Sequence, residues 1–133
     1  MTTIEVKTHH RNELLDVTAQ VARVVSDSGV HRGAAVLYVP HTTAGCTINE
    51  NADPDVRHDI LLTLSDLVPQ DRRGYRHGEG NSDAHTKASL IGFSQTVLIE
   101  NGRLVLGTWQ GIYFAEFDGP RNRHMHVRVV PHG

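Results

Sequence analysis

The sequence is poor in the features that mark secreted, membrane-bound or nucleic-acid-binding proteins. Cys46 is its only cysteine, so no intrachain disulfide can form. No apolar run approaches the ~20 residues that cross a bilayer, and the N-terminus lacks the layout of a signal peptide. Lysine is scarce, with two residues against eleven arginines, and the net charge is −2 with neutral histidines. We therefore expect a cytoplasmic protein that binds neither nucleic acid nor membranes.

Motifs of common enzyme folds are missing as well. Gly74, Gly78 and Gly80 lie close together, but no GxGxxG or GxxxxGK[ST] occurs between a strand and a helix, and there is no GxSxG. The sequence thus gives no support to a nucleotide-binding fold or a serine hydrolase. Cys46 could act as a nucleophile only with a nearby base and a lowered pKa; a small buried residue is the alternative.

What is present fits one globular domain over residues 1–133, with 38% hydrophobic and 21% charged residues. Hydrophobic periodicity predicts helices over 12–29 and 53–69, the second capped by Asp53. Strands are expected within 3–8, 33–48 with a break at Pro40, 94–120 with a hairpin at Asn101-Gly102, and 124–131. The polar segment 69–86 is long enough for a binding loop. This pattern indicates an α+β fold with an antiparallel β-sandwich core and two main helices.

Histidine is the residue in excess, with ten copies scattered along the chain. His41 follows a predicted strand, and His77 and His85 lie in the polar segment 69–86. Three imidazoles that leave one position open are typical of a catalytic zinc site, whereas surface or hydrogen-bonding histidines are the simpler interpretation. His124 and His126 point to the same side of the last strand and could bind a metal as a pair, or form an exposed polar face.

Other candidates also have two interpretations. Glu50 precedes a helix and could be a general base or an orienting partner for a histidine, or part of a turn. Arg121 and Arg123 could clamp a phosphate, or lie in a solvated turn. Trp109 is flanked by glycines in the sequence, so it could stack on a planar ring instead of packing in the core.

Several motifs together resemble the YjbQ-like family, often labelled secondary thiamine-phosphate synthase enzymes. They are HTTAG (41–45), NENADPDV (49–56), YRHGEGNSDAHTKASLIG (75–92) and NGRLVLGTWQGIYFAEFDGPRNR (101–123). The resemblance covers about residues 35–125. Three residues depart from those usual in the family: Thr86, within the third motif, and His124 and His126, which follow the last one.

The resemblance implies a compact α+β fold with a β-sandwich core, a homotrimer, and a polar pocket near a subunit boundary. It implies a divalent metal ion, with zinc expected at the histidines and magnesium as an alternative with a diphosphate substrate. The implied metal ligands are His41, His77 and His85; the catalytic residues Glu50 and Arg121; and the substrate-binding residues Asn49, Asn81, Trp109, Gln110, Glu116 and Arg123.

The activity that the resemblance implies joins a pyrimidine-methyl diphosphate to a thiazole phosphate and releases pyrophosphate. We therefore expect a metal-dependent transferase that acts on a small phosphorylated heterocycle, and the label indicates that this activity could be secondary. A homotrimeric module that binds a metabolite or metal without turnover is the alternative.

Overall fold

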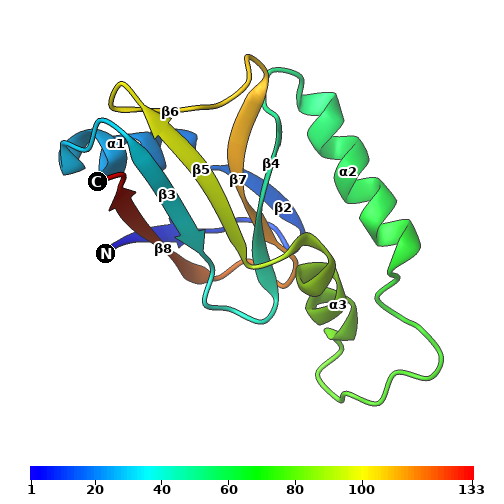
Figure 1. Ribbon diagram of the computed structural model, residues 1–133. Coiled ribbons are helices and arrows are strands. Elements are labelled where there is room, and N and C mark those ends of the chain that lie inside the picture. The colour runs from blue at the N-terminus through cyan, green and yellow to red at the C-terminus, as the bar shows by residue number, and fades with distance from the viewer.

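A computed structural model describes residues 1–133, and Figure 1 shows its helices and strands. In chain order they are β1 (Thr2–Lys7), β2 (Glu13–Asp16), α1 (Thr18–Ser28), β3 (Gly33–Tyr38), β4 (Ala44–Glu50), α2 (Pro54–Leu67), α3 (Ser82–Ile91), β5 (Ser94–Glu100), β6 (Arg103–Leu104), β7 (Gln110–Glu116) and β8 (Asn122–Pro131). The predicted α+β class is confirmed, with three helices instead of two.

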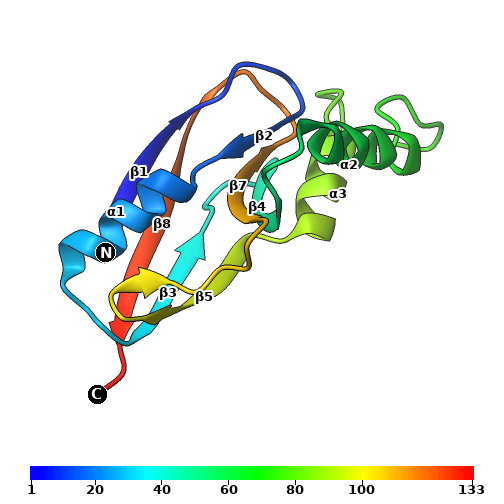
Figure 2. The same ribbon diagram turned by 90° about the horizontal axis from the view of Figure 1, so that it is seen from above.

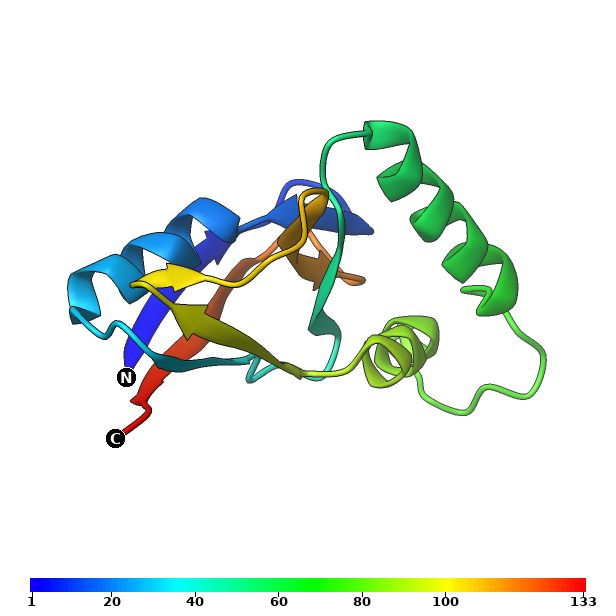
Figure 3. The ribbon, with the colours of Figure 1, turned by 45° about the horizontal axis from the view of Figure 1, so that its top comes forward.

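Two antiparallel sheets form the framework: a five-stranded sheet ordered β1-β8-β3-β5-β6 and a three-stranded sheet ordered β2-β7-β4. Both sheets and α1 contribute to one apolar core, in which Val21, Leu37, Phe114 and Met125 are fully buried. Burial of each such side chain stabilises the fold by roughly 1.5–3 kcal/mol. Figures 2 and 3 show α1 at one end of the molecule and α2 and α3 at the other.

The prediction of a helix over 12–29 is wrong for its first residues. Residues Glu13–Asp16 form β2 and pair with Tyr113–Glu116 of β7, and the helix begins only at Thr18. Asp16 Oδ1 accepts hydrogen bonds from the backbone N–H and the hydroxyl of Thr18, at 2.9 and 2.6 Å. These bonds fix the chain direction between strand and helix. The predicted end at Gly29 is confirmed by its left-handed φ of 69°.

The loop predicted over 69–86 is too long at its C-terminal end, because its last residues belong to a third helix, α3. Its buried residues are Asp83, Ala84, Lys87 and Ala88, so two of the four inward positions carry charge. A helix that buries an aspartate and a lysine has no continuous apolar stripe, which is the signal that sequence periodicity reads. The helix is therefore invisible to a hydrophobic pattern although it is well formed.

Helix α2 begins as predicted. Asp53 Oδ1 accepts the N–H of Asp55 at 2.9 Å, and Pro54 occupies the first turn. None of its residues is fully buried. Its partly buried side chains pack against a second apolar cluster, whereas Leu62 and Leu67 are 53% and 71% exposed. The buried residues of this cluster are Leu14, Ala84, Ala88, Tyr113, Ala115 and Phe117. None of the three helices combines the length and apolarity needed to span a membrane.

The predicted strands after α3 are present. Asn101 and Gly102 have φ values of 52° and 72°, as a tight turn between β5 and β6 requires. In β8, Met125 and Val127 are buried on one face of the strand, as alternation of side chains along a strand leads one to expect. The opposite face of β8 carries His124, His126 and Arg128.

Candidate functional site

Apart from His77 and His85, the sequence-predicted site residues fall into two groups at opposite ends of the three-stranded sheet. In the β4–β7 ladder Glu50 pairs with Gln110, and Ala44 pairs with Glu116. Six residue steps along a strand span about 20 Å. Asn49, Glu50, Trp109 and Gln110 therefore belong to one end of the sheet. The other end holds His41, Asn81, Glu116, Arg121 and Arg123.

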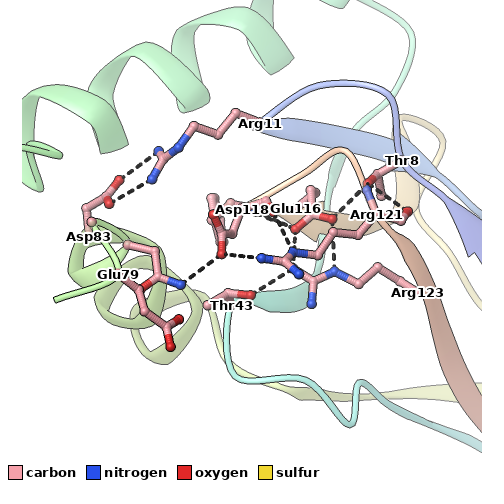
Figure 4. Close-up of polar contacts among 12 residues, drawn as sticks. Thr8, Arg11, Thr43, Glu79, Asp83, Glu116, Asp118, Arg121 and Arg123 are labelled. Atoms are coloured by element: carbon pink, nitrogen blue, oxygen red, sulfur yellow. Dashed lines mark hydrogen bonds and ion pairs between the residues drawn. The ribbon is translucent and has the colours of Figure 1, made fainter. Parts of the chain in front are cut away.

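Glu116 is the centre of the second group, at the end of β7 (Figure 4). Its carboxylate is fully buried and accepts hydrogen bonds from Arg123 Nε at 2.9 Å and Nη2 at 2.6 Å. It also accepts the Thr8 hydroxyl at 2.8 Å and the N–H groups of Phe117 and Asp118, both at 3.1 Å. Five donors occupy the carboxylate, so its main role is to fix Arg123 and the turn after β7.

Arg123 connects this buried centre to a cavity of about 500 Å³ lined by Tyr38, Val39, Pro40, His41, Thr42, Phe93 and Arg123. Nη2 of Arg123 also donates to the Thr43 hydroxyl at 2.7 Å. Its hydrogen bonds use Nε and Nη2, which leaves Nη1 without a protein partner. The guanidinium is thus held on one side and can donate to a bound anion through Nη1.

His41 lies beside Arg123 and is held as a neutral imidazole. Burial lowers its pKa, and the nearby positive charge of Arg123 lowers it further. Its Nε2 accepts the backbone N–H of His124 at 3.1 Å. An accepting Nε2 requires the proton of the neutral ring to be on Nδ1. In this arrangement neither nitrogen of His41 offers a free lone pair to a metal ion.

Asp118 joins the start of α3 to the turn between β7 and β8. Its Oδ2 accepts the Asn81 amide at 2.9 Å and Arg121 Nη2 at 3.0 Å, while its carbonyl accepts Arg121 Nε at 2.8 Å. The Arg121 side chain is still about half exposed, at 53%. The Oδ1 atom of Asn81 is buried without a hydrogen-bond partner. Arg121 is thus anchored, with part of its guanidinium open to a ligand.

His77 and His85 meet near the start of α3. Their ring centres are 5.5 Å apart and the rings are almost perpendicular, at 86°. His77 also lines a cavity of about 340 Å³ with Gln70, Asp71, Arg72, Arg73, Tyr75, Gly80 and Ser82. Two guanidinium groups at one cavity favour an anionic ligand. Sequence reasoning noted this segment as a binding loop but singled out neither Arg72 nor Arg73.

The predicted three-histidine metal site is not assembled within one chain. No group of three or more His, Cys, Asp or Glu side chains is arranged to hold a metal ion. His77 and His85 adjoin each other, whereas His41 packs against His124 with ring centres 4.8 Å apart. A catalytic zinc site uses three protein ligands and one open position. The donors of a single chain therefore do not fit a complete site of this kind.

Glu50, at the other end of the sheet, makes local bonds. Its carboxylate accepts the N–H of Asp53 at 3.3 Å, and its carbonyl accepts the Tyr113 hydroxyl at 2.9 Å. Asn49 Oδ1 in turn accepts the N–H of Glu50 at 2.7 Å. These contacts match the turn interpretation, and no histidine ring is among the partners of Glu50.

Trp109 and Gln110 lie beside Glu50. The indole of Trp109 is not in the core, since the residue is 62% exposed. Gln110 is also exposed, and its Oε1 accepts the N–H of Gly107 at 2.8 Å. An exposed tryptophan next to polar groups can stack on a planar ring, as the alternative interpretation requires.

Cys46 is not a reactive thiol. It lies in β4 with no exposed surface, and burial raises its pKa to about 12. Thiol chemistry requires the thiolate, which is a negligible fraction at neutral pH with this pKa. Cys46 is therefore the small buried residue of the two interpretations, and its role as a nucleophile is rejected.

A buried charged cluster that sequence reasoning missed holds α3 in place. Asp83 accepts two hydrogen bonds from the Arg11 guanidinium, both at 3.0 Å, and one from Lys87 Nζ at 2.9 Å. Lys87 Nζ also donates to Asn12 Oδ1 at 3.3 Å. Asp83 and Lys87 lie four residues apart within the motif 75–92. This spacing of opposite charges is the one signal in the sequence that could have indicated an ion pair on a helix. The cluster fixes the helix that carries His85.

Similarity to known proteins agrees with this architecture. The family description UPF0047 protein YjbQ-like matches residues 2–132. The chain belongs to the YjbQ/UPF0047 family. UPF0047 protein MJ1081 of Methanocaldococcus jannaschii is 56% identical over 95% of this chain and 91% of the relative, and YugU of Bacillus subtilis is 52% identical over 96% and 97%.

A solved structure gives the same result for the fold. An uncharacterized conserved protein of the family from Clostridium acetobutylicum superimposes with a TM-score of 0.96 at 54% identity, over 98% of this chain and all of that one. None of these three names states an activity or a cofactor, so the comparisons establish the family and the fold.

Proposed function

We propose that this YjbQ-family protein is an enzyme that acts on a small phosphorylated heterocycle, at the end of the molecule where α3 begins. The observation that carries the proposal is the cavity of about 340 Å³ in which Arg72 and Arg73 adjoin His77, with His85 facing that histidine. Guanidinium groups bind phosphate oxygens through two parallel hydrogen bonds. Imidazole nitrogens beside them can donate hydrogen bonds to the same ligand or accept them from it.

The specific activity that we propose is formation of thiamine phosphate. A ring nitrogen of the thiazole phosphate forms a bond to the methylene carbon of the pyrimidine substrate, and the bond from that carbon to the diphosphate oxygen breaks. The electron pair of the broken bond leaves with pyrophosphate. Fixed positive charge at the departing diphosphate stabilises the transition state, because the charge is already in place when the bond breaks. Arg72, Arg73 and the exposed part of Arg121 are the groups that supply this charge.

Turnover can be tested with the purified protein and the two substrates. We expect thiamine phosphate and pyrophosphate in equal amounts, separated by chromatography, and a rate about 10²-fold lower in the Arg72→Ala/Arg73→Ala double variant. Arg23→Ala is the matched control, since Arg23 is an 85% exposed side chain in α1. If the wild-type protein forms no product, the named activity is refuted. If the double variant keeps the full rate, the assigned cavity is refuted.

Metal dependence belongs to this proposal only through assembly of several copies. In a homotrimer, His41 of a second copy would complete the pair formed by His77 and His85 once its ring turns away from the His124 N–H, which frees Nε2 for a metal ion. His41→Ala and His85→Ala proteins would then each lack metal in elemental analysis. Co-refolding the two variants would restore part of the metal content, because some interfaces would combine intact donors from both. Retention of metal by either variant alone would refute this ligand set.

A non-catalytic binding module is the second candidate, and the saturation of Glu116 and the engagement of His41 favour it. These groups hold neighbours in place and have no unoccupied acceptor directed at the larger cavity. Such a module predicts thermal stabilisation by a phosphorylated heterocycle without turnover, since a ligand that binds the folded state stabilises it by mass action. The trimeric assembly and the cytoplasmic location remain predictions under both candidates.

A further inference from the structure

His124 and His126 form a second pair of imidazoles, separate from His77 and His85. Both project from β8 on the side opposite Met125 and Val127, which are buried in the core. They therefore lie on the outer face of the five-stranded sheet. Their ring centres are 5.4 Å apart, with 60° between the ring planes.

The separation of the two rings is the one that a shared metal ion requires. The Cα atoms of residues i and i+2 on a strand are about 7 Å apart. Two imidazoles bound to one tetrahedral ion have ring centres roughly 5 Å apart, because each nitrogen lies about 2 Å from the ion. The rings of His124 and His126 thus lean toward each other to near that distance without an ion.

The contacts of His126 leave one ring nitrogen ready to bind. Thr3 is the cross-strand neighbour of His126 in β1, and its hydroxyl lies 3.0 Å from His126 Nδ1. If Nδ1–H donates to this hydroxyl, Nε2 keeps its lone pair, which is the arrangement that a neighbouring group imposes on most metal-ligating histidines. The ring of Tyr38 stacks on His126 at 6.5 Å and limits its rotation.

Neither ring nitrogen of His124 makes a hydrogen bond, whereas its backbone N–H donates to His41 Nε2. Glu5 is its cross-strand neighbour in β1, so a carboxylate projects from the same face and favours a cation there. The third ring nearby, that of His41, lies 4.8 Å from His124, but its Nε2 is engaged by the His124 N–H. A site made of the other two imidazoles is therefore weak and exchangeable, and water fills the remaining positions.

We propose that His124 and His126 bind a divalent transition-metal ion on the outer face of the five-stranded sheet, with Thr3 as the positioning residue. Imidazole ligands suit copper and zinc, and Cu(II) is the stronger binder of the two at a site of given donors. This site shares no residue with the cavity at Arg72 and Arg73, but it adjoins His41, whose Nε2 accepts the backbone N–H of His124.

Titration of metal-free protein with Cu(II), followed by calorimetry and electron paramagnetic resonance, tests the proposal. We expect an event with nitrogen coordination whose affinity falls about tenfold or more in His124→Phe and in His126→Phe, which keep an aromatic ring of similar size without a ligand nitrogen. Thr3→Val should weaken binding less than the removal of either ring. His58→Phe is the matched control, since the His58 side chain is 71% exposed on α2.

The other histidine pair must be separated from this one. In the His77→Ala/His85→Ala double variant the same Cu(II) event should remain. Unchanged binding in both phenylalanine variants would overturn the proposal, and so would loss of the event in the double variant. If the phenylalanine variants do not fold, paramagnetic broadening of imidazole resonances in wild-type protein decides: it must affect His124 and His126 at the lowest Cu(II) concentrations, and broadening confined to other histidines refutes the site.

Discussion

Replacement of Glu116 by glutamine tests the central claim about the site, namely that a buried carboxylate fixes Arg123. Glu116 has no exposed surface, and each of its oxygens accepts at least two donors. Glutamine keeps the shape of the side chain but converts one acceptor oxygen into an NH2 group. The variant therefore removes the charge and one acceptor without opening a cavity.

The expected loss of stability follows from these contacts. If the NH2 group takes the place of Oε1, it faces the Thr8 hydroxyl, which can reorient, and Arg123 Nε–H, which cannot. A buried donor without an acceptor costs about 1–3 kcal/mol. Arg123 is only 6% exposed, and its guanidinium also loses its counter-charge. Breaking a buried ion pair by removing one partner costs about 3–5 kcal/mol in total.

Urea denaturation at pH 7, followed by circular dichroism, measures this loss. With a slope of roughly 2 kcal/mol/M, a loss of about 4 kcal/mol moves the midpoint about 2 M lower. Wild type and variant must be compared at one protein concentration, because assembly into oligomers would make apparent stability depend on concentration. A loss below about 1 kcal/mol would refute the claim that the carboxylate balances a buried guanidinium.

A double variant separates charge balance from packing. Glu116→Gln combined with Arg123→Met removes both charges. We therefore expect its loss of unfolding free energy to be about 1–3 kcal/mol smaller than the sum of the losses in the two single variants. It should still be less stable than wild type, because the Thr43 hydroxyl loses the hydrogen bond from Arg123 Nη2. Additive losses would show that the two side chains act independently.

Three further predictions concern other parts of the fold. Cys46, with a pKa of about 12, should react with a disulfide reagent only after unfolding; rapid labelling of native protein would contradict its burial. Burial alone would raise the pKa of Asp83, but hydrogen bonds from Arg11 and Lys87 lower it, so this stabilisation is present above about pH 4 and lost as pH falls through the folded pKa. The stability difference between wild type and Asp83→Asn should therefore narrow between pH 7 and pH 3 in urea titrations, and a constant difference would argue against the ion pairs. In Gly45→Ala the new Cβ would lie 2.4 Å from the carbonyl oxygen of Gly92, so we expect a loss of about 1–3 kcal/mol, whereas Gly78→Ala, with no atom within 4 Å, should be neutral in the same assay.

The parts of the fold that follow simple periodicity could be predicted from the sequence. Helix α2 has a cap, a proline in its first turn and an apolar stripe, and the hairpin at Asn101-Gly102 has the residues that its turn demands. Strand β2 was predicted as part of a helix because Leu14 and Val17 also fit a helical spacing. Pairing of β2 with β7, nearly a hundred residues away in the chain, decides between the two and leaves no local trace.

The sequence could indicate single candidate residues of the site, but it could not indicate which residues they contact. The motif around residues 75–92 drew attention to His77 and His85, whose rings adjoin, but it did not indicate that Asp83 and Lys87 are buried and hold the helix. Burial of an ion pair depends on Arg11, which lies 72 residues away from Asp83. A local pattern cannot distinguish a solvated aspartate from one that accepts a guanidinium inside the protein.

The division of the motif residues between two ends of one sheet is the main consequence of the structure for function. Motifs at 41–45 and 49–56 are close in sequence, but β4 runs between them and separates His41 from Glu50 by nearly its full length. One small substrate cannot contact both ends of a span of about 20 Å within a single chain. Either the two groups act on different ligands, or a second copy brings one end against the other. The exposed Trp109 and Leu67 and the pair His77–His85 offer surfaces for such a contact, so loss of metal or turnover together with dissociation in dilute protein would distinguish the second case from the first.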